Sequence, residues 1–393
     1  MKSISNILVI ARREAGLLLA DRWTAAAMLA APLLVGGIMA LIYSGRIVRD
    51  IPTLVVDEDQ SSTSRLLARA LDANEFLSVV ATRSTTAGME ESLRDGSVQC
   101  AVQIPRGAER DLKRGQQVHI VFTVNGTNIV AAVSAIRGAS EVAGTLAAGI
   151  RMENMERRGV PSMMVFNAAV PVEITHRFVF NPAEEYSTFL LPGLLIALIQ
   201  QVVMVGTALS WAREFQDGIL GGLRSISTSI GEQMTGKLIP YIAVGLLWSV
   251  VFFAGVFPLF GIPFTGSVMA ASVALAMMTI AMGLLAMTIS AAAVDKVTAM
   301  QFVFIVSSPA FLVSGFTFPL MAMTAPVRVF AALIPTTHFL AAWRRIVLYG
   351  AGFENIGVEL GIMAAMIVGF GLSTFLLVRR RSSRVVAPAE GLS

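Results

Sequence analysis

One segment of the chain has the residue types and spacing of a phosphate-binding loop. Gly231, Gly236 and Lys237 follow the order glycine, four residues, glycine, lysine, in which backbone amides and the lysine hold nucleotide phosphates. The next residue is Leu238, whereas a working loop places Ser or Thr there to hold Mg²⁺. No apolar strand precedes Gly231, and we expect Lys237 to open a membrane-spanning segment. We therefore predict that the chain itself binds no ATP, no Mg²⁺ and no other cofactor.

Other residues that could do chemistry have plainer explanations. The carboxylate run at residues 57–59, Asp-Glu-Asp, could bind a metal, but it ends a predicted strand before capping serines, which favours a solvated turn. Cys100 is the single cysteine, so we expect neither an internal disulfide nor a cysteine zinc cluster. The histidines are scattered and lack metal-site spacing, at His119, His176 and His338. We predict no catalytic residue and no metal site.

Charged residues are scarce and unevenly distributed. The 393 residues are 55% hydrophobic and 14% charged, whereas soluble chains are about 25% charged. Residues 238–294 include no Asp, Glu, Lys or Arg, and a membrane-spanning helix needs only about 20 apolar residues. The chain is therefore predicted to be integral to a lipid bilayer. Its net charge of +4 lies beside apolar segments, as orientation signals do, so we expect no nucleic-acid partner.

The fold class predicted is an α-helical polytopic membrane protein with an inserted extracytoplasmic α/β domain. Six transmembrane helices are expected at about 23–45, 187–212, 239–260, 268–294, 297–321 and 357–378. The turn signal at 261–263, Gly-Ile-Pro, separates the third from the fourth. A cleaved signal peptide is the alternative for the first, but its lead-in and its apolar segment are both longer than usual.

Basic residues indicate the orientation. Lys and Arg precede the first span, follow the second and follow the sixth, so the positive-inside rule makes both termini and the 212–238 loop cytoplasmic. Residues 379–393 then form a cytoplasmic basic tail, and residues 46–186 lie outside. Residues 1–22 are predicted to be a cytoplasmic interfacial helix, with an unstructured leader as the alternative. Its apolar face would consist of Ile4, Ile7, Leu8, Ala11, Ala15 and Leu18.

Residues 46–186 alternate between strand and helix patterns. Four apolar segments are predicted as strands, namely PTLVVD, FLSVVAT, VQCAVQI and VHIVFTV. A helical pattern lies between each of these segments and the next, and a long alanine-rich helix runs from after Asn128 to about Arg158. Such alternation predicts a sheet with helices packed on it.

Segment 211–241, WAREFQDGILGGLRSISTSIGEQMTGKLIPY, resembles the cytoplasmic segment of type-2 ABC transporter permeases, the membrane subunits of exporters. The matching residues are Arg213, Glu214, Gly218, Leu220, Leu223, Gly236, Lys237, Pro240 and Tyr241. The chain departs from the family pattern at Gly221, where an acidic residue is usual, and near Ile226, where a proline is missing.

Three further segments carry the resemblance over most of the chain. NPAEEYSTFLLPGL resembles the start of the second span, and LIPTTHFLAAWRRIVLYGAG resembles the outer amphipathic hairpin, at 333–352, before the sixth. VVDEDQSSTSRLLARAL, with VQCAVQIPRGAERDLKRG, resembles the outer domain of the subgroup with a large insertion between spans one and two.

The resemblance implies an ATP-driven exporter of the bacterial inner membrane. The partners it implies are two ABC ATPase subunits, which hold ATP and Mg, and a second permease copy in a homodimer or a heterodimer with a paralogue. A periplasmic adaptor protein is left open. An apolar or amphipathic substrate is favoured because the spans offer few charges. The alternative is a non-transporting membrane protein whose outer domain serves binding, secretion or assembly.

The 212–238 loop is predicted to couple the permease to the ATPase. Arg213 and Glu214 would be exposed charges at the end of the second span, and Leu220 and Leu223 would seat in a groove of the partner. The remaining motif residues are Gly218, Gly236 and Lys237. Plain anchoring of the helix end is the alternative.

Polar residues within the spans are the candidates for a translocation path, although such residues more often pack helices together. They are Gln200, Gln201, Ser307 and Ser308.

Overall fold

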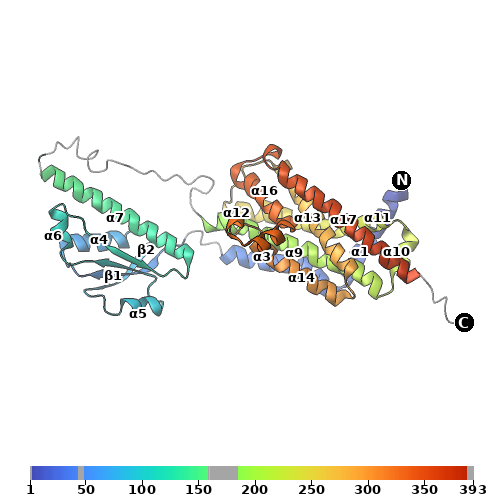
Figure 1. The fold of residues 1–393 in the computed structure, drawn as a ribbon, viewed down its shortest axis with the longest axis horizontal. Coiled ribbons are helices and arrows are strands. Elements are labelled where there is room, and N and C mark those ends of the chain that lie inside the picture. Colours follow the sequence, from blue (N-terminus) through green and yellow to red (C-terminus); the bar gives the residue numbers. More distant parts are fainter. Residues whose placement is uncertain (1, 43–47, 158, 160–184, 387–393) are drawn as a thin grey trace. The chain divides into compact units, whose positions relative to one another are not determined.

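The computed structural model describes residues 2–42, 48–157, 159 and 185–386. The chain divides into two compact units (Figure 1). Unit 1 comprises Met1–Arg46 and Phe178–Ser393, and unit 2 comprises Ile47–Arg177.

Unit 2 contains a four-stranded sheet in the order β2-β1-β3-β4. Its strands are β1 (Ile51–Asp57), β2 (Leu77–Arg83), β3 (Cys100–Ile104) and β4 (Val121–Val124). β1 pairs in parallel with β2 and β3, while β4 is antiparallel to β3. β1 is buried along nearly its whole length, as expected for a central parallel strand covered on both faces. The four strands lie within or next to the four segments predicted as strands.

Four helices cover this sheet. They are α4 (Ser62–Asp72), α5 (Met89–Arg94), α6 (Ala108–Lys113) and α7 (Ile129–Arg157). Residues Ile51 and Val55 of β1 pack with α4, α6 and α7, whereas Leu54 and Val56 pack with α5. Alternate side chains of a strand point to opposite faces, so α4, α6 and α7 cover one face of the sheet and α5 covers the other.

Unit 1 is helical. Its N-terminal helices are α1 (Lys2–Ala20), α2 (Arg22–Leu29) and α3 (Ala31–Ile42), and the next are α9 (Tyr186–Gln216), α10 (Leu220–Ile226) and α11 (Ile230–Val250). A π-helical segment, Val251–Val256, joins α11 to α12 (Phe257–Phe260). The remaining helices are α13 (Val268–Ala292), α14 (Lys296–Val313), α15 (Ala325–Ala332), α16 (Pro335–Tyr349) and α17 (Gly357–Val386).

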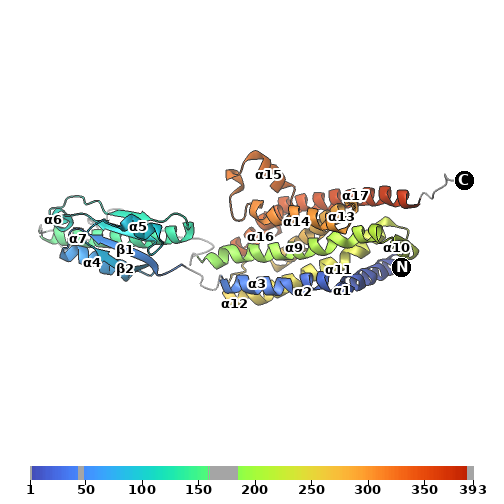
Figure 2. The same cartoon turned by 90° about the horizontal axis from the view of Figure 1, so that it is seen from below.

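α9 occupies the centre of unit 1, where it packs against α11, α13 and α14. Figure 2 shows α1, α2 and α3 following one another along one side of the bundle, and α1 packs against α11. Residues of the predicted apolar face of α1 divide between the bundle, where Ala11 is buried, and the exposed surface of this chain. Ile4 and Leu8 are exposed, while Ile10 and Glu14 are buried together with Leu18. The helix turns this face inward because Glu14 has charged and polar partners in the bundle.

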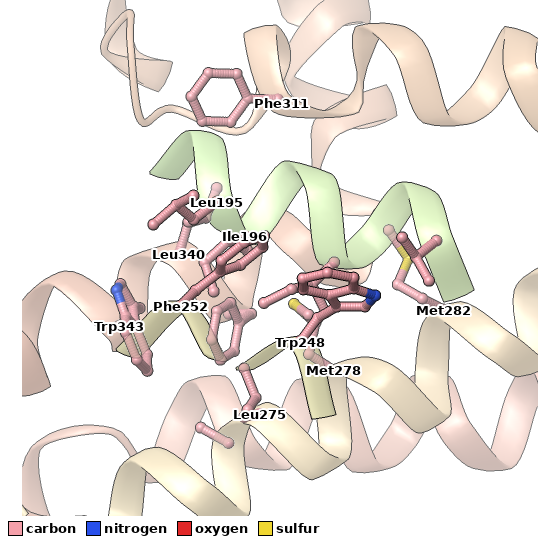
Figure 3. Close-up of a cluster of buried hydrophobic side chains, with 14 of the residues drawn as sticks. Leu195, Ile196, Trp248, Phe252, Leu275, Met278, Met282, Phe311, Leu340 and Trp343 are labelled. Carbon is pink, nitrogen blue, oxygen red and sulfur yellow. The ribbon is translucent and has the colours of Figure 1, made fainter. Parts of the chain in front are cut away.

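Aromatic and aliphatic side chains from several helices form the core of unit 1 (Figure 3). Trp248 and Phe252 of the α11 region pack in it with Leu195, and Trp343 of α16 contacts Phe253 at a centroid distance of 4.4 Å. Residues 333–352 were expected to form an amphipathic hairpin, but α16 is a single helix over Pro335–Tyr349. One of its faces enters the core at Phe339, Leu340, Trp343, Ile346 and Val347. α15 and α16 meet at 82°.

Seven helices within the described residues are long and apolar enough to cross a membrane, or eight if the bent pair α15–α16 is one span. Six lie in unit 1 at the positions of the six predicted spans, and the seventh is α7 of unit 2. Length and composition alone select these helices. The chain is thus a multi-pass helical membrane protein, and the number of spans stays a prediction.

Three helix ends differ from the predicted ones. α11 begins at Ile230, not near 239, because Ser229 accepts a hydrogen bond from the Glu232 amide and caps it. α14 ends at Val313, not near 321, since Gly315 adopts a left-handed conformation with φ +81°. α17 continues to Val386 through residues expected in the tail.

Candidate functional site

A buried cluster of charged side chains lies where α1, α9 and α11 meet. Lys237 Nζ is 2.6 Å from Glu14 Oε2 and 2.8 Å from Glu214 Oε1. Arg13 Nη2 donates to Glu214 Oε2 at 3.2 Å, and the Tyr241 hydroxyl donates to Glu14 Oε1 at 2.6 Å. Lys237 also donates to the Ser210 carbonyl at 3.0 Å. The Lys237 and Glu214 side chains are 0% exposed, and Glu14 is 1% exposed.

Helix periodicity brings these groups to one place. Lys237 and Tyr241 are four residues apart on α11, as are Ser210 and Glu214 on α9, so each pair shares a helix face. Gly236 lets α1 approach, because a Cβ there would lie 2.7 Å from Ile10 Cβ and 2.9 Å from the backbone oxygen of Ile7.

Two carboxylates balance two cations in this cluster. Burying an ion is costly unless it is paired and hydrogen-bonded, and each of the four charges has at least one partner here. The Trp211 ring lies 5.5 Å from Lys237 Nζ and closes one side. The arrangement fixes α1 to α9 and α11, so a displacement of one of these helices must move the others or break buried ion pairs.

This geometry corrects the expected roles of four residues in the 212–238 segment. Glu214 is not an exposed docking charge, because Arg13 and Lys237 hold it inside the bundle. Leu220 and Leu223 are not free to enter a partner's groove, because they pack in this chain with Ile10 and Met234, among other residues. Lys237 lies inside α11 rather than at its start, and its ammonium group is held by Glu14, Glu214 and the Ser210 carbonyl. Residues 231–237 are helical, which excludes the backbone of a phosphate loop.

Arg213 and Gly218 lie outside the charge cluster. Arg213 lies next to Glu214 but lines a pocket with Lys296 rather than joining the cluster. Gly218 adopts φ +67° in the turn between α9 and α10 and has open space around its Cα. The structure therefore brings together Glu214, Gly236 and Lys237 and leaves Gly218 at the surface.

The polar candidates within the spans divide into two groups. Gln200 is buried, donates to the Ser307 carbonyl at 3.1 Å and accepts from the Thr336 hydroxyl. These bonds join α9, α14 and α16, so Gln200 and Ser307 lie within the packing of this chain. Gln201 is half-buried and Ser308 is exposed.

The carboxylate run of unit 2 caps helices. Asp57 is buried and accepts from the Ser64 hydroxyl at 2.7 Å, so it is less solvated than a surface turn. Asp59 accepts from the amides of Gly107 and Glu109 at the start of α6. Within the described residues, no group of three His, Cys, Asp or Glu side chains could hold a metal ion.

Sequence reasoning missed Arg13 and Glu14 as members of the cluster. Glu14 is the only acidic residue before Asp21 and falls within an apolar helical pattern. Such an isolated acid signals a buried partner. Its partner Lys237 is 223 positions away, so no local pattern could identify the pair.

Basic segments gather at one end of unit 1, where the N-terminus, α10 and the end of α17 lie together (Figures 1 and 2). Arg224 donates to the Ser382 carbonyl at 3.2 Å, and Arg381 donates to the Val294 carbonyl at 3.1 Å. Asn6 of α1 donates to Glu232 of α11 at 3.0 Å. Both described chain ends and the 212–238 segment thus meet at the end that holds the charge cluster.

Comparison with known proteins finds a family and several relatives that this chain resembles. Residues 22–376 match the model of the ABC-2 family transporter protein. The chain is 25% identical over 395 residues to the inner membrane transport permease YhhJ of Escherichia coli, covering 98% of this chain and 99% of YhhJ. It is 28% identical over 216 residues to the probable multidrug ABC transporter permease YbhS of the same species. That match covers 53% of this chain and 56% of YbhS.

A second probable multidrug permease of Escherichia coli, YbhR, is 24% identical over 209 residues, which are 53% of this chain and 57% of YbhR. The chain thus matches about half the length of the two multidrug permeases and nearly all of YhhJ. The family match begins after α1, extends from α2 into α17 of unit 1 and crosses unit 2. This chain belongs to the ABC-2 transporter family and is a membrane subunit of that family.

Proposed function

We propose that this chain is the permease subunit of an ATP-driven exporter and that separate ATPase subunits supply the energy. One observation carries the proposal beyond family membership. The lysine of the phosphate-loop-like segment lies inside a helix and is held by Glu14 and Glu214. This segment therefore has no free lysine to offer a nucleotide, which supports the proposal that ATP binds on a partner chain.

The proposed topology has six spans, α2–α3, α9, α11–α12, α13, α14 and α17, in the bacterial inner membrane. We leave α7 out of this count because it packs on the sheet of unit 2 through Ala131, Ala135 and Val142. The gathering of basic segments at one end of unit 1 supports cytoplasmic termini, which leaves unit 2 outside. In a Cys100→Ala background, an impermeant thiol reagent applied to whole cells should label Ser84→Cys and spare Ser225→Cys. The reverse pattern would contradict this topology.

The coupling surface is proposed on the outward side of the 212–238 segment. Gly218, Gly221 and Ser225 are exposed there, while Arg213, Glu214 and Lys237 support the segment from inside. A Cβ added at Gly221 meets no neighbouring atom within 4 Å, so Gly221→Glu should weaken ATPase association without affecting folding. Gly126→Glu, also in open space, is the matched control in unit 2. Equal ATPase recovery with both variants would remove this surface from the proposal.

An apolar or amphipathic substrate is proposed, in keeping with relatives named as multidrug permeases and with spans that offer few charges. Two such chains with two ATPase subunits would form the transporter. Cells with and without the chain should differ in accumulation of several hydrophobic dyes. Equal accumulation across the panel would contradict this substrate class.

Affinity purification of the tagged full chain tests whether a separate ATPase binds this chain. We expect an ATPase with a complete phosphate loop to co-purify, and we expect ATP hydrolysis by the complex. Robust hydrolysis by the chain alone would overturn the proposal. Recovery without any ATPase, together with a phenotype that needs only unit 2, would instead indicate a binding or assembly protein.

A further inference from the structure

A pocket of about 680 Å³ opens between α1–α2, α9 and α14 in unit 1. Its polar lining includes Asp21, Arg213 and Lys296, and its apolar lining includes Leu209 and Met300. It is distinct from the charge cluster, because none of the cluster's four charged residues lines it.

Arg213 is nine-tenths buried, and its Nη1 atom is buried without a hydrogen-bond partner. Within the described residues its guanidinium also forms no salt bridge. A buried cation without a partner is strongly unfavourable, and buried polar atoms are nearly always hydrogen-bonded. Asp21 attracts this guanidinium through space, but no hydrogen bond joins the two, so Nη1 lacks an acceptor among the described residues.

The other charged groups of the pocket already have partners. Asp21 caps α2 by accepting from the Trp23 amide at 3.1 Å and the Thr24 hydroxyl at 2.6 Å. Lys296 pairs with Asp217 at 2.8 Å, and both side chains are partly exposed. An anion in the pocket would find the positive charge of the partly exposed Lys296 and the unpartnered Nη1 donor of Arg213.

The pocket lies where three candidate spans end. These candidate spans begin at Arg22, end at Gln216 and begin at Lys296, so the proposed six-span topology puts the pocket near the depth of the lipid headgroups on whichever side it faces. Leu209 is about 10 Å deeper along α9 than Gln216, at 1.5 Å per residue. The apolar lining therefore reaches the acyl chains, because the headgroup region is about 5–8 Å thick on each side.

We propose that this pocket binds a membrane phospholipid, with Arg213 donating hydrogen bonds to its phosphate and an acyl chain lying along Leu209 and Met300. The planar guanidinium matches phosphate oxygens in geometry, and basic pockets between transmembrane helices bind lipid headgroups. The proposal goes beyond export and does not depend on it, since the lipid would bind whether or not the chain transports anything.

Photolabelling of the full chain in detergent micelles tests the site. The probes are phosphatidylethanolamine and phosphatidylglycerol, each carrying a diazirine on an acyl chain, and labelled peptides are mapped by mass spectrometry. We expect label on the peptides that hold Leu209 and Met300. Arg213→Gln should lower it by at least about tenfold, because a hydrogen bond to a charged group is lost. Soluble glycerol phosphate in excess should not displace the lipid.

Two further variants keep the test decisive. Arg12→Gln removes the same charge from an exposed position on neighbouring α1 and should leave the label unchanged. Met300→Trp fills the apolar part while Arg213 stays intact, so it should also exclude the lipid if Arg213→Gln fails to fold. Unchanged labelling of folded Arg213→Gln or of Met300→Trp would overturn the proposal. Equal loss with Arg12→Gln, or displacement by glycerol phosphate, would overturn it as well.

Discussion

Lys237 Nζ lies 2.8 Å from Glu214 Oε1, and both side chains are completely buried. One residue ends the α9 span and the other lies two turns into α11, so the pair joins the helices on either side of the 212–238 segment. Glu14 adds α1 to the same contact. A force applied to this segment would reach three helices through ion pairs rather than through surface charges.

Loss of the Glu214 carboxylate should destabilise the protein. Glu214→Ala removes a partner from Lys237 and from Arg13, and breaking a buried ion pair costs about 3–5 kcal/mol. The expected result is a lower midpoint of thermal unfolding of the full chain in detergent, followed by tryptophan fluorescence.

An ion pair of equal length at the surface supplies the control for Glu214. Asp217 contacts Lys296 at 2.8 Å, with side chains 39% and 35% exposed, and such pairs contribute about 0–1 kcal/mol. Asp217→Ala should therefore unfold nearly like the wild type. If both variants unfold alike, burial of the Lys237–Glu214 pair does not stabilise the fold as described.

Close packing of α1 on α11 should depend on Gly236. A methyl group there would meet Ile10 Cβ at 2.7 Å and the backbone oxygen of Ile7 at 2.9 Å, and backbone cannot move aside cheaply. Gly236→Ala should therefore loosen α1 and speed tryptic cleavage at Arg12 and Arg13 in the full chain.

Gly231 provides the matched change five residues earlier in the same helix. A Cβ at Gly231 meets only Ser229 Oγ, at 3.8 Å, so Gly231→Ala should keep the wild-type cleavage rate. A Gly236→Ala protein as resistant to trypsin as Gly231→Ala would show that the α1–α11 approach is not close.

Acid should open unit 2, with Cys100 as the reporter. Hydrogen bonds from Ser62, Lys113 and Thr63 lower the pKa of Glu109 from 4.5 to about 2. A lowered pKa adds stability above the unfolded value of 4.5 that is lost as the pH falls toward 2. Cys100 is buried, and burial raises the pKa of its thiol, so labelling is slow while the sheet is closed.

Labelling of Cys100 in the full chain by a disulfide reagent that stays reactive in acid measures this opening. The rate should rise as the pH falls from 4.5 to 2. Glu109→Gln lacks the titrating carboxylate and should give a flatter pH profile over that range. Identical profiles for the two proteins would assign the acid sensitivity to other groups.

Local patterns predicted the elements of this protein well. Apolar runs placed the helices of unit 1, and alternation placed β1 to β4. The predicted helix boundaries were wrong where a single residue sets the end of the helix. The Ser229 cap begins α11 early, and the left-handed Gly315 follows the early end of α14.

The candidate site was predictable only in part, because its contacts join distant segments. The family motif indicated Glu214 and Lys237, yet their positions beside apolar spans suggested surface charges. Helix α1 covers Glu214 and Lys237, and its Arg13 and Glu14 complete the cluster. Leu220 and Leu223 likewise looked available for a partner until α10 folded against Ile10. Long-range pairing of this kind has no local signature.

ATP-dependent dye transport into inverted membrane vesicles tests the account most directly. Vesicles containing the chain and its co-purifying ATPase should take up a hydrophobic dye when ATP is added. Vesicles with the chain alone, or with an ATPase lacking its phosphate-loop lysine, should take up none. Uptake driven by the chain without a functional ATPase would contradict the account.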